Sequence, residues 1–446
     1  MRLKSSPKRE GLNRSLTPEE TLARVAPRMK TIGITRVSDI TGLDRLGIPV
    51  WSAVVPKSRD FLSVYNGKGA SHIGAKVGAI MEAFERHAAL TFERSYLRAS
   101  YEDVVKSRRA MDPTAAGIPM DPQYTKDREI LWTEGHEIAT GEPVLVPADL
   151  AGLNPPGIPL ASRAYGICSS NGLASGNTYE EAVAQALCEL VERDAWTIAV
   201  ILGHWVPRAK FEAARAKAGL PKLDWRGQEQ PFSDDGERYP MIDLDTVDGD
   251  VRRLCDLFLE AGLPPTLREI TSDIGVPTFT ATVCEDVDRD LPRAHLGVGT
   301  HPEARIAALR ALSEAAQSRV VDIQGVREDM SGATEDVPSY MIHAKRVSRI
   351  NKKSWLHMET ELRRSYRDVG SSRTEDTLDD ITRIVSALQR CGLPSAIEVD
   401  LTNPAVGVPV TRVIVPGLES WAADHGRIGS RGAKHWNLAR SEQRSA

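Results

Sequence analysis

The feature that most constrains the fold of this chain is a residue spacing that occurs twice in full and a third time in altered form. Each full copy has a glycine, a glutamate thirteen residues later, a second glutamate three residues after the first, and an arginine directly behind it. The full copies comprise Gly69, Glu82, Glu85 and Arg86, and Gly176, Glu189, Glu192 and Arg193. The third copy has two more residues before Glu314, replaces the second acid by Gln317, and moves the arginine one place to Arg319.

Alanines also recur in all three copies, seven and three residues before the first glutamate. They are Ala75 and Ala79, Ala182 and Ala186, and Ala307 and Ala311. Positions i, i+4, i+7 and i+10 share one face of an α-helix, so each copy predicts a helix with two small residues followed by two polar ones along one stripe. Small residues let a neighbouring helix or strand approach closely. We therefore expect each polar pair at the end of a packed seam.

The paired acids have two interpretations. A single Glu-x-x-Glu-Arg segment is most simply a solvated helix end with local ion pairing. Solvated positions, however, have no reason to repeat a carboxylate pair at a fixed distance from a glycine and an alanine stripe. Glu82, Glu85, Glu189 and Glu192 would repel one another if they converged, unless cations neutralised them. Oxygen ligands without Cys or His indicate a hard cation, and Mg²⁺ above all.

A short glycine-bounded segment ahead of the first helix offers contacts for phosphate. Mg²⁺ usually binds through a few carboxylates, waters and substrate phosphates, so we infer a nucleoside triphosphate as its partner. Lys68, in a loop predicted at residues 66–69, can reach those phosphates, while Gly67 and Gly69 let backbone amides approach them. The segment is not a Walker motif, because no serine or threonine follows the lysine, and an ordinary turn is the alternative.

The second copy carries further polar residues at helical spacing. Asn177, Glu181 and Gln185 precede Glu189 and Glu192 at intervals of four, four, four and three. These positions lie on one stripe of a helix with a slow drift. A helix cap is the alternative for Asn177, and a satisfied buried amide is the alternative for Gln185.

Composition excludes several classes of protein. The chain has 446 residues, 41% of them hydrophobic and 26% charged, and can bury a sizeable core. Its net charge of −4 gives no global reason to expect binding to nucleic acid or to a membrane surface. The five cysteines are scattered and never form a CxxC pair, which argues against a disulfide framework or a zinc site. Without a signal peptide or a long apolar run, we expect a cytoplasmic protein.

The order of structural signals predicts a mixed α/β fold of sheets and helices built from the threefold repeat. We expect a basic lead-in with a short helix at residues 1–30, mobile up to about residue 16, with a helix start at Thr17-Pro18-Glu19-Glu20. A catalytic domain would follow at 31–421, and a polar, frayed tail at 422–446. Strands are predicted at residues 48–55, 61–65, 278–283 and 411–415. Loops are predicted at residues 113–122, 154–157 and 222–238.

Five ordered motifs resemble the YcaO superfamily: Asn66-Gly-Lys-Gly69, Glu82-Ala-Phe-Glu85-Arg86, the segment from Ser170 to Thr178, Glu189-Leu-Val-Glu192-Arg193, and the segment from Ser313 to Arg319. Val413-Ile-Val-Pro-Gly417-Leu-Glu419 is similar to its closing motif. The resemblance implies binding of ATP and Mg²⁺ and phosphorylation of a peptide backbone amide oxygen. It implies that Glu82, Glu85, Glu189 and Glu192 hold Mg²⁺, and that Glu82, Glu189 and Arg193 are catalytic. The residues that it implies around the nucleotide are Lys68, Ser71, Asn177, Glu181, Gln185, Arg193 and Arg412.

The subfamily is a separate question. Residues 35–50 look like the TfuA-associated branch, for which the resemblance implies thioamide formation with a sulfur donor. A peptide or protein substrate, a TfuA-like partner or sulfur-delivery protein, and a homodimer would then be expected. Azoline formation from Cys, Ser or Thr is the alternative, although azoline enzymes of this family typically end in a proline-rich tail and this chain has no proline after Pro416. A non-catalytic nucleotide-binding regulator is a further alternative. The chemistry needs no protein nucleophile, and we interpret Cys168 as a small packing residue.

Overall fold

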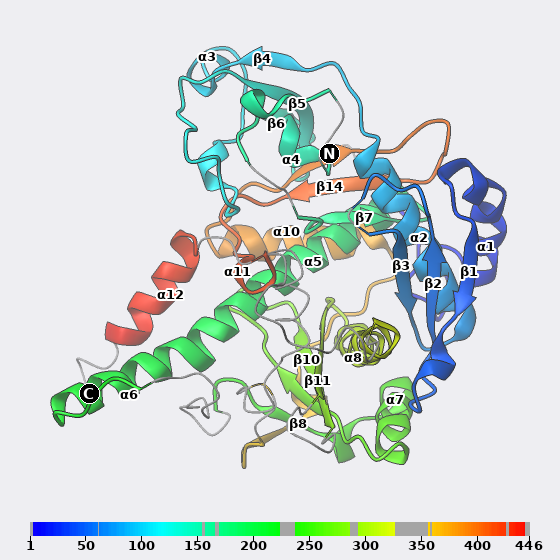
Figure 1. The fold of residues 1–446 in the computed structure, drawn as a ribbon, viewed down its shortest axis with the longest axis vertical. Coiled ribbons are helices and arrows are strands. Elements are labelled where there is room, and N and C mark those ends of the chain that lie inside the picture. Colours follow the sequence, from blue (N-terminus) through cyan, green and yellow to red (C-terminus); the bar gives the residue numbers. More distant parts are fainter. Residues whose placement is uncertain are drawn as a thin grey trace.

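The computed structural model describes residues 3–60, 62–153, 157–165, 169–223, 237–285, 293–325, 356, 359–424 and 428–441. Three β-sheets and the helices packed on them make up the fold, which confirms the predicted mixed α/β class (Figure 1). Phe61, Cys168 and the loop predictions for residues 154–156 and 224–236 lie outside the described residues.

A three-stranded antiparallel sheet carries the first copy of the spacing. It contains β1 (Arg36–Asp39), β2 (Val50–Val54) and β3 (Val64–Lys68), with α2 (His72–Leu90) packed on β2 and β3 and α1 (Pro18–Val25) packed against α2. A capping box at Thr17 begins α1, as predicted: its side chain accepts the Glu20 amide while the Glu20 carboxylate accepts the Thr17 amide.

The prediction of a loop at residues 66–69 is wrong in part, because β3 continues through Lys68. Gly67 allows the α2 backbone to lie directly on the strand: a Cβ at this position would come 2.1 Å from the carbonyl oxygen of Ala75 and 2.1 Å from the amide nitrogen of Ala79. The glycine therefore serves a close approach of helix and strand, where the sequence indicated a turn.

A six-stranded sheet carries the second copy. Its main path runs in the order β4 (Leu97–Ala99), β5 (Ile130–Glu137), β13 (Ile397–Asp400), β14 (Val410–Ile414) and β7 (Leu173–Ser175), and β6 (Pro143–Pro147) pairs with β5. Helix α5 (Tyr179–Val200) packs on β7 and β14, and α10 (Thr377–Arg390) packs against α5. The short helices α3 (Tyr101–Val104) and α4 (Ala148–Ala151) lie in the connections of this region.

A five-stranded sheet carries the third copy. Its order is β11 (Arg293–Thr300), β10 (Thr278–Glu285), β9 (Thr266–Glu269), β8 (Met241–Asp243) and β12 (Arg363–Ser365), with only β8 and β12 parallel. Helix α8 (Ala304–Gly325) packs on β11 and β10, and α7 (Gly249–Glu260) packs against α8. A Cβ on Gly299 would lie 2.1 Å from the carbonyl oxygen of Ala307, so this glycine repeats the close approach seen at Gly67.

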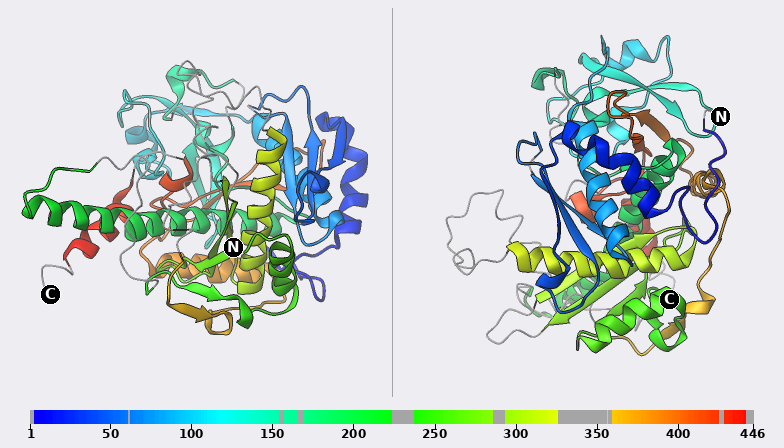
Figure 2. Two further views of the ribbon diagram at one scale, coloured as in Figure 1. Left: turned by 60° about the horizontal axis from the view of Figure 1, so that its bottom comes forward. Right: turned by 90° about the vertical axis from the view of Figure 1, so that its right-hand side faces the viewer.

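Each of the three sheets places an edge strand next to the helix that carries a copy of the spacing. The pairs are β3 with α2, β7 with α5 and β11 with α8. All six alanines of the predicted stripes are completely buried. Figure 2 shows α2, α5 and α8 running in different directions through the molecule, with the three sheets around them. The polar residues that follow the alanines are therefore brought to the region where the sheet edges meet.

Both chain ends differ from the prediction. Leu3 is buried in the apolar core under α5 and α10, and the Nζ atom of Lys8 lies 2.5 Å from a carboxylate oxygen of buried Asp380. At the other end, α11 (Trp421–Asp424) is followed by α12 (Ser430–Ser441), whose Arg431 is buried in an ion pair with Asp194. Composition showed the charges of these ends but not their distant partners, so a mobile lead-in and a frayed tail were the wrong expectations for the described residues.

Helix α5 runs without a break into a π-helical turn at Ile201–Trp205 and then into α6 (Val206–Lys217), which extends away from the body of the molecule beside α12 (Figure 1). In the described part of the chain, no helix combines the length and the apolar character needed to cross a membrane.

Candidate functional site

A pocket of about 800 Å³ lies between α2, α5, α8 and the N-terminal segment. Nine of the eleven predicted site residues line it. They are Lys68, Glu82, Glu85, Asn177, Glu181, Gln185, Glu189, Glu192 and Arg193. The three helices meet here because each is packed by its alanines onto a different sheet, with its polar residues one or two turns farther along the same face.

The other two predicted residues lie outside the pocket lining. Ser71 is the N-cap of α2, and its side chain accepts the amide of Gly74 at 3.2 Å. Arg412 is buried on β14 and donates to the backbone carbonyl of Ser169 at 2.9 Å and to that of Asn171. Its guanidinium thereby holds the segment that carries Ser170, whose hydroxyl accepts a hydrogen bond from Arg86 in the pocket. Contacts of Ser71 and Arg412 with a nucleotide remain predictions.

Four pocket carboxylates share a perturbed environment. Burial raises the pKa of each one, Glu82, Glu85, Glu189 and Glu192. For Glu85 the next cause is the charge of Glu189, which raises its pKa further. The exposed fractions of the Glu82 and Glu189 side chains are 30% and 23%, and both residues line the pocket. Carboxylates that converge in this way favour either protonation or a bound cation.

The arginines behind the acids turn back toward them. The Nη2 atom of Arg86 lies 3.8 Å from a carboxylate oxygen of Glu82. The Nη2 atom of Arg193 lies 3.7 Å from a carboxylate oxygen of Glu192. The Glu82 carboxylate also accepts the backbone amide of Asn66, at the free edge of β3, at 3.1 Å. Within the ranges that the structure describes, no three Asp, Glu, His or Cys side chains form a group that could hold a metal ion unaided. The donor set nevertheless fits Mg²⁺, which takes its remaining ligands from water and phosphate.

The third copy contributes a residue that the sequence prediction left out of the site. Glu314 lines the pocket and forms an ion pair with Lys68 of β3. Burial raises its pKa, but the charges of Lys68 and Arg193 and the amide of Val298 outweigh burial, so the pKa of Glu314 is lowered. Its position seven residues after Ala307 was the available signal. The altered arginine spacing concealed it.

The cationic end of the pocket was also missed. Arg14 from the N-terminal segment donates to Oε1 of Gln185 at 3.3 Å, and Arg310 of α8 donates to the same atom. The backbone amide and the hydroxyl of Ser15 both donate to Oε1 of Glu181, at 2.6 and 2.7 Å. Arg310 stands four residues before Glu314, as Gln185 stands four before Glu189, so the repeat could have indicated it. No local pattern marks Arg14.

The pocket therefore combines acidic side chains that favour a cation with lysine and arginine side chains that favour an anion. A metal complex of a polyphosphate satisfies both requirements, because phosphate oxygens accept hydrogen bonds from the cationic groups while sharing the metal with the carboxylates. Catalytic roles for the individual residues stay predictions.

Comparison with known proteins supports this reading of the pocket. Residues 66–419 match the model of a family described as YcaO cyclodehydratase, ATP- and Mg²⁺-binding. A protein of unknown function from Methanothermobacter thermautotrophicus is 35% identical over 94% of this chain and 98% of its own length. An uncharacterized protein encoded in the tfuA 3′ region of Rhizobium leguminosarum bv. trifolii is 33% identical over 91% of this chain and 89% of its own length.

Two solved structures have the same fold. YcaO from Methanopyrus kandleri, bound with AMPPCP and Mg²⁺, is 27% identical, with a TM-score of 0.64 over 94% of this chain and 95% of that one. A heterocyclase in complex with substrate and cofactor is 21% identical, with a TM-score of 0.72 over 94% of this chain. This chain spans only 54% of the heterocyclase, whose similarity shows the fold alone.

The matched range lies inside the catalytic domain predicted at residues 31–421, whose bounds remain a prediction. The expectation of ATP and Mg²⁺ as cofactors is confirmed at the level of the family. Three features agree: the ordered motifs, the matched range and the acid-lined pocket at the junction of three sheets. This chain belongs to the YcaO family.

Proposed function

We propose that this chain binds Mg-ATP in the acid-lined pocket and uses it to phosphorylate a backbone amide oxygen of a peptide or protein substrate. The observation that carries this proposal is the convergence of Glu82, Glu85, Glu189 and Glu192, with pKa values raised by burial, beside Lys68 and Arg193. A cation neutralises the converging acids, and a polyphosphate supplies both further ligands for that cation and acceptors for the lysine and arginine.

The residues divide into two groups. Glu82, Glu85, Glu189 and Glu192 would hold Mg²⁺, which would supply neutralising charge beside the transferring phosphoryl group. Lys68 and Arg193 would hold the phosphate oxygens, because both lie next to these acids and carry permanent donors. Glu181 and Gln185 lie one to two turns earlier on α5, Asn177 lies just before the N-cap of this helix, and all three would face the remainder of the nucleotide. Ser71 and Arg412 would support the site from α2 and β14.

The reaction explains why the protein needs no nucleophile of its own. An amide carbonyl is a weak electrophile, and its oxygen is a poor leaving group. When an external nucleophile adds to the carbonyl carbon, the oxygen can take the γ-phosphoryl group of ATP and then depart as phosphate, leaving ADP. The protein's task is then to orient the two substrates and to stabilise the charge that develops on the oxygens.

We propose a sulfur donor as the nucleophile and a thioamide as the product. Support comes from the relative in the tfuA 3′ region, which is 33% identical over nearly the whole of both chains. A TfuA-like partner or another sulfur-delivery protein would bring the sulfur, and two copies of this chain would form a homodimer. An azoline-forming cyclodehydratase is the second candidate, favoured by the description of the family.

The first experiment is a calorimetric titration of ATP into the purified protein, with and without Mg²⁺. We expect Mg²⁺-dependent binding that the Glu189→Gln variant loses, while the variant stays folded because carboxylate repulsion is relieved. Glu180→Gln is a matched control, since Glu180 belongs to the same helix but accepts a hydrogen bond from Lys4 and does not line the pocket. Equal Mg²⁺-dependent binding by wild type and Glu189→Gln would show that the metal assignment is wrong.

Product identity needs a second measurement. After incubation with Mg-ATP, a sulfide source and a candidate substrate peptide, the peptide mass distinguishes the two candidates. Exchange of oxygen for sulfur supports thioamide formation, whereas loss of water supports azoline formation. ATP consumption without any change of peptide mass would contradict both.

A further inference from the structure

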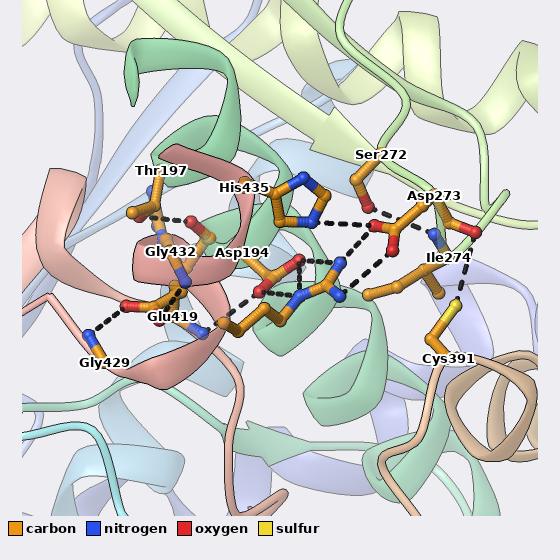
Figure 3. Close-up of polar contacts among 12 residues, drawn as sticks. Asp194, Thr197, Ser272, Asp273, Ile274, Cys391, Glu419, Gly429, Gly432 and His435 are labelled. Carbon is orange, nitrogen blue, oxygen red and sulfur yellow. Dashed lines mark hydrogen bonds and ion pairs between the residues drawn. The ribbon is translucent and has the colours of Figure 1, made fainter. Parts of the chain in front are cut away.

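Helix α12 is fastened to α5 by one buried arginine. Arg431 donates through Nε to both carboxylate oxygens of Asp194, at 2.9 and 3.1 Å, and through Nη2 to Oδ2 at 3.0 Å (Figure 3). Asp194 has an exposed fraction of 0%, and the Arg431 side chain one of 8%. A carboxylate so deeply buried depends on this partner for its charge, because removing one member of a buried pair leaves the other uncompensated.

The same guanidinium also reaches the five-stranded sheet. Its Nη1 donates to Oδ2 of Asp273 at 3.1 Å, and its Nη2 contacts the other oxygen. Asp273 lies in the connection between β9 and β10, next to the strand on which α8 packs. A hydrogen bond from His435 and the charge of Arg431 hold the pKa of Asp273 well below its usual range. Arg431 thus joins the helix that carries Glu189 to the sheet that supports Glu314.

A second set of contacts holds the same turn of α5. The Glu419 carboxylate accepts the amides of Gly429 and Gly432 at 2.8 and 2.7 Å, at the start of α12, while the Glu419 amide donates to Asp194 at 3.1 Å. The Ala422 amide donates to the hydroxyl of Thr197 at 3.1 Å. That hydroxyl in turn donates to the backbone carbonyl of Arg193, at 2.8 Å.

The two faces of α5 therefore have different partners. Glu189, Glu192 and Arg193 line the pocket, whereas Asp194 and Thr197 are held by the C-terminal segment. Asp194 follows Arg193 directly, so a rotation or shift of the helix at Asp194 moves the pocket residues by a similar amount. Displacements of about 1 Å at a catalytic centre can cost about 100-fold in rate.

We propose that Arg431 is a positioning residue: through Asp194 and Asp273 it sets α5 against the sheet that bears α8, and so fixes the spacing of Glu189, Glu192 and Arg193 from Glu314. Arg431 does not line the pocket and acts only through the carboxylates that it holds. This inference rests on the proposed function, because the spacing matters for a ligand that contacts several of these helices.

The test compares wild type with R431Q and R431K in two measurements. The first is amide hydrogen exchange of the ligand-free protein over residues 185–193, which we expect to be faster in R431Q and intermediate in R431K. The second is the ratio of ATP affinities with and without Mg²⁺, which we expect to fall by about tenfold or more in R431Q at a temperature where the variant is fully folded. R252Q is the matched control, because Arg252 forms an exposed i,i+4 ion pair with Asp256 on α7.

Each outcome is decisive. A folded R431Q with a lower melting temperature but unchanged exchange and an unchanged affinity ratio would show a merely structural role and overturn the proposal. If R431Q does not fold, D273N replaces it: this variant keeps the pair with Asp194 and loses a charge from the half-exposed partner. An affinity ratio for D273N equal to that of wild type would again overturn the proposal. If wild type binds no Mg-ATP, the proposed function fails, and the exchange measurement alone decides whether Arg431 positions α5.

Discussion

The arginines of the second and third copies of the spacing do opposite work. Arg193 stands four residues after Glu189 and turns back to its own helix, 3.9 Å from Glu189 and 3.7 Å from Glu192. Arg319 stands five residues after Glu314 and turns away from the pocket. Its Nε lies 2.8 Å from Asp44, and its Nη1 lies 2.6 Å from Glu285. One arginine belongs to the pocket, and the other fastens α8 to its surroundings.

A displacement of one residue explains the difference. Successive residues of an α-helix are separated by about 100°, so an arginine moved by one place points to another side of the helix. Asp44 and Glu285 are available on that side, at the end of the turn Thr41–Leu43 and of β10. Four residues after Glu314 the chain has Ser318 in place of an arginine, and Glu314 pairs with Lys68 from β3. A residue that departs from the spacing of a repeat can therefore have a different structural role from its counterparts.

The largest effect that we expect is on stability, from R319Q. Arg319 and Asp44 are both buried, so the variant leaves a buried carboxylate without its counter-charge and should lose roughly 3–5 kcal/mol of unfolding free energy. R193Q removes an arginine that lies among carboxylates with raised pKa values, and these can take up protons. R193Q should therefore lose less unfolding free energy than R319Q. Urea denaturation of both variants measures the two changes.

The losses of Mg-ATP binding should have the reverse order. R193Q should lose Mg-ATP binding, while R319Q, measured where it is folded, should retain it. Equal losses of stability in the two variants would contradict the division between a pocket arginine and a fastening arginine.

The close approach of helix to strand at Gly67 on β3 and at Gly299 on β11 is common to the regions of the first and third copies, and it gives the next largest effect. G299A would place a Cβ 2.1 Å from the carbonyl oxygen of Ala307, so the helix or strand must move. Overpacking of this kind costs about 1–3 kcal/mol. G370A is the control, because no atom lies within 4 Å of its Cβ, and it should stay within about 0.5 kcal/mol of wild type. Equal melting temperatures of G299A and G370A in thermal unfolding would contradict the close packing of helix on strand at Gly299.

Sequence was sufficient for most of what depends on local spacing, although the same spacing also marked Glu314 and Arg310, which the prediction left out of the site. The alanine stripes predicted which helix faces would be buried, and all six alanines are. The glutamates and Gln185 lie on the predicted stripe and line the pocket. The role of Gly67 was misassigned, because a glycine that permits close packing of a helix on a strand looks the same in sequence as a glycine in a phosphate-binding loop or an ordinary turn.

Sequence was insufficient wherever a residue finds its partner far along the chain. Arg14 meets Gln185 across 171 positions, and Arg431 meets Asp194 across 237. A basic segment with no hydrophobic periodicity is consistent with a solvent-exposed tail as much as with a segment packed against the protein. The local sequence does not indicate which distant carboxylate or amide its arginines will bind. Lys8 and Arg431 are therefore the residues for which composition misled the prediction.

The pH dependence of stability separates the acids of the full copies from Glu314. The pKa of Glu85 is raised well above the value of about 4.5 that it has in an unfolded chain. The folded state therefore binds the proton more tightly, and the stability contributed by neutral Glu85 is lost as the pH rises from about 4.5 through the raised pKa. E85Q should consequently be more stable than wild type near pH 8, by about 1 kcal/mol or more, and equal to it below about pH 4.5. Urea titrations across this range, without nucleotide or metal, measure the difference. A constant difference at every pH would contradict the assignment.

The smallest effect should come from E314Q, and it should have the opposite sign. Lys68 and Arg193 lower the pKa of Glu314, so this carboxylate contributes stability above about pH 4.5 that disappears as the pH falls through the lowered value. Because the Lys68 and Glu314 side chains are each about a quarter exposed to the pocket, solvent screens the pair, and E314Q should lose no more than about 1 kcal/mol near pH 8. The variant also frees Lys68 for phosphate, so ATP measured without Mg²⁺ should bind it more tightly than wild type. If E314Q instead becomes more stable than wild type as the pH rises, as we expect for E85Q, then Glu314 behaves like the acids of the full copies. The distinction between the third copy and the full copies would then fail.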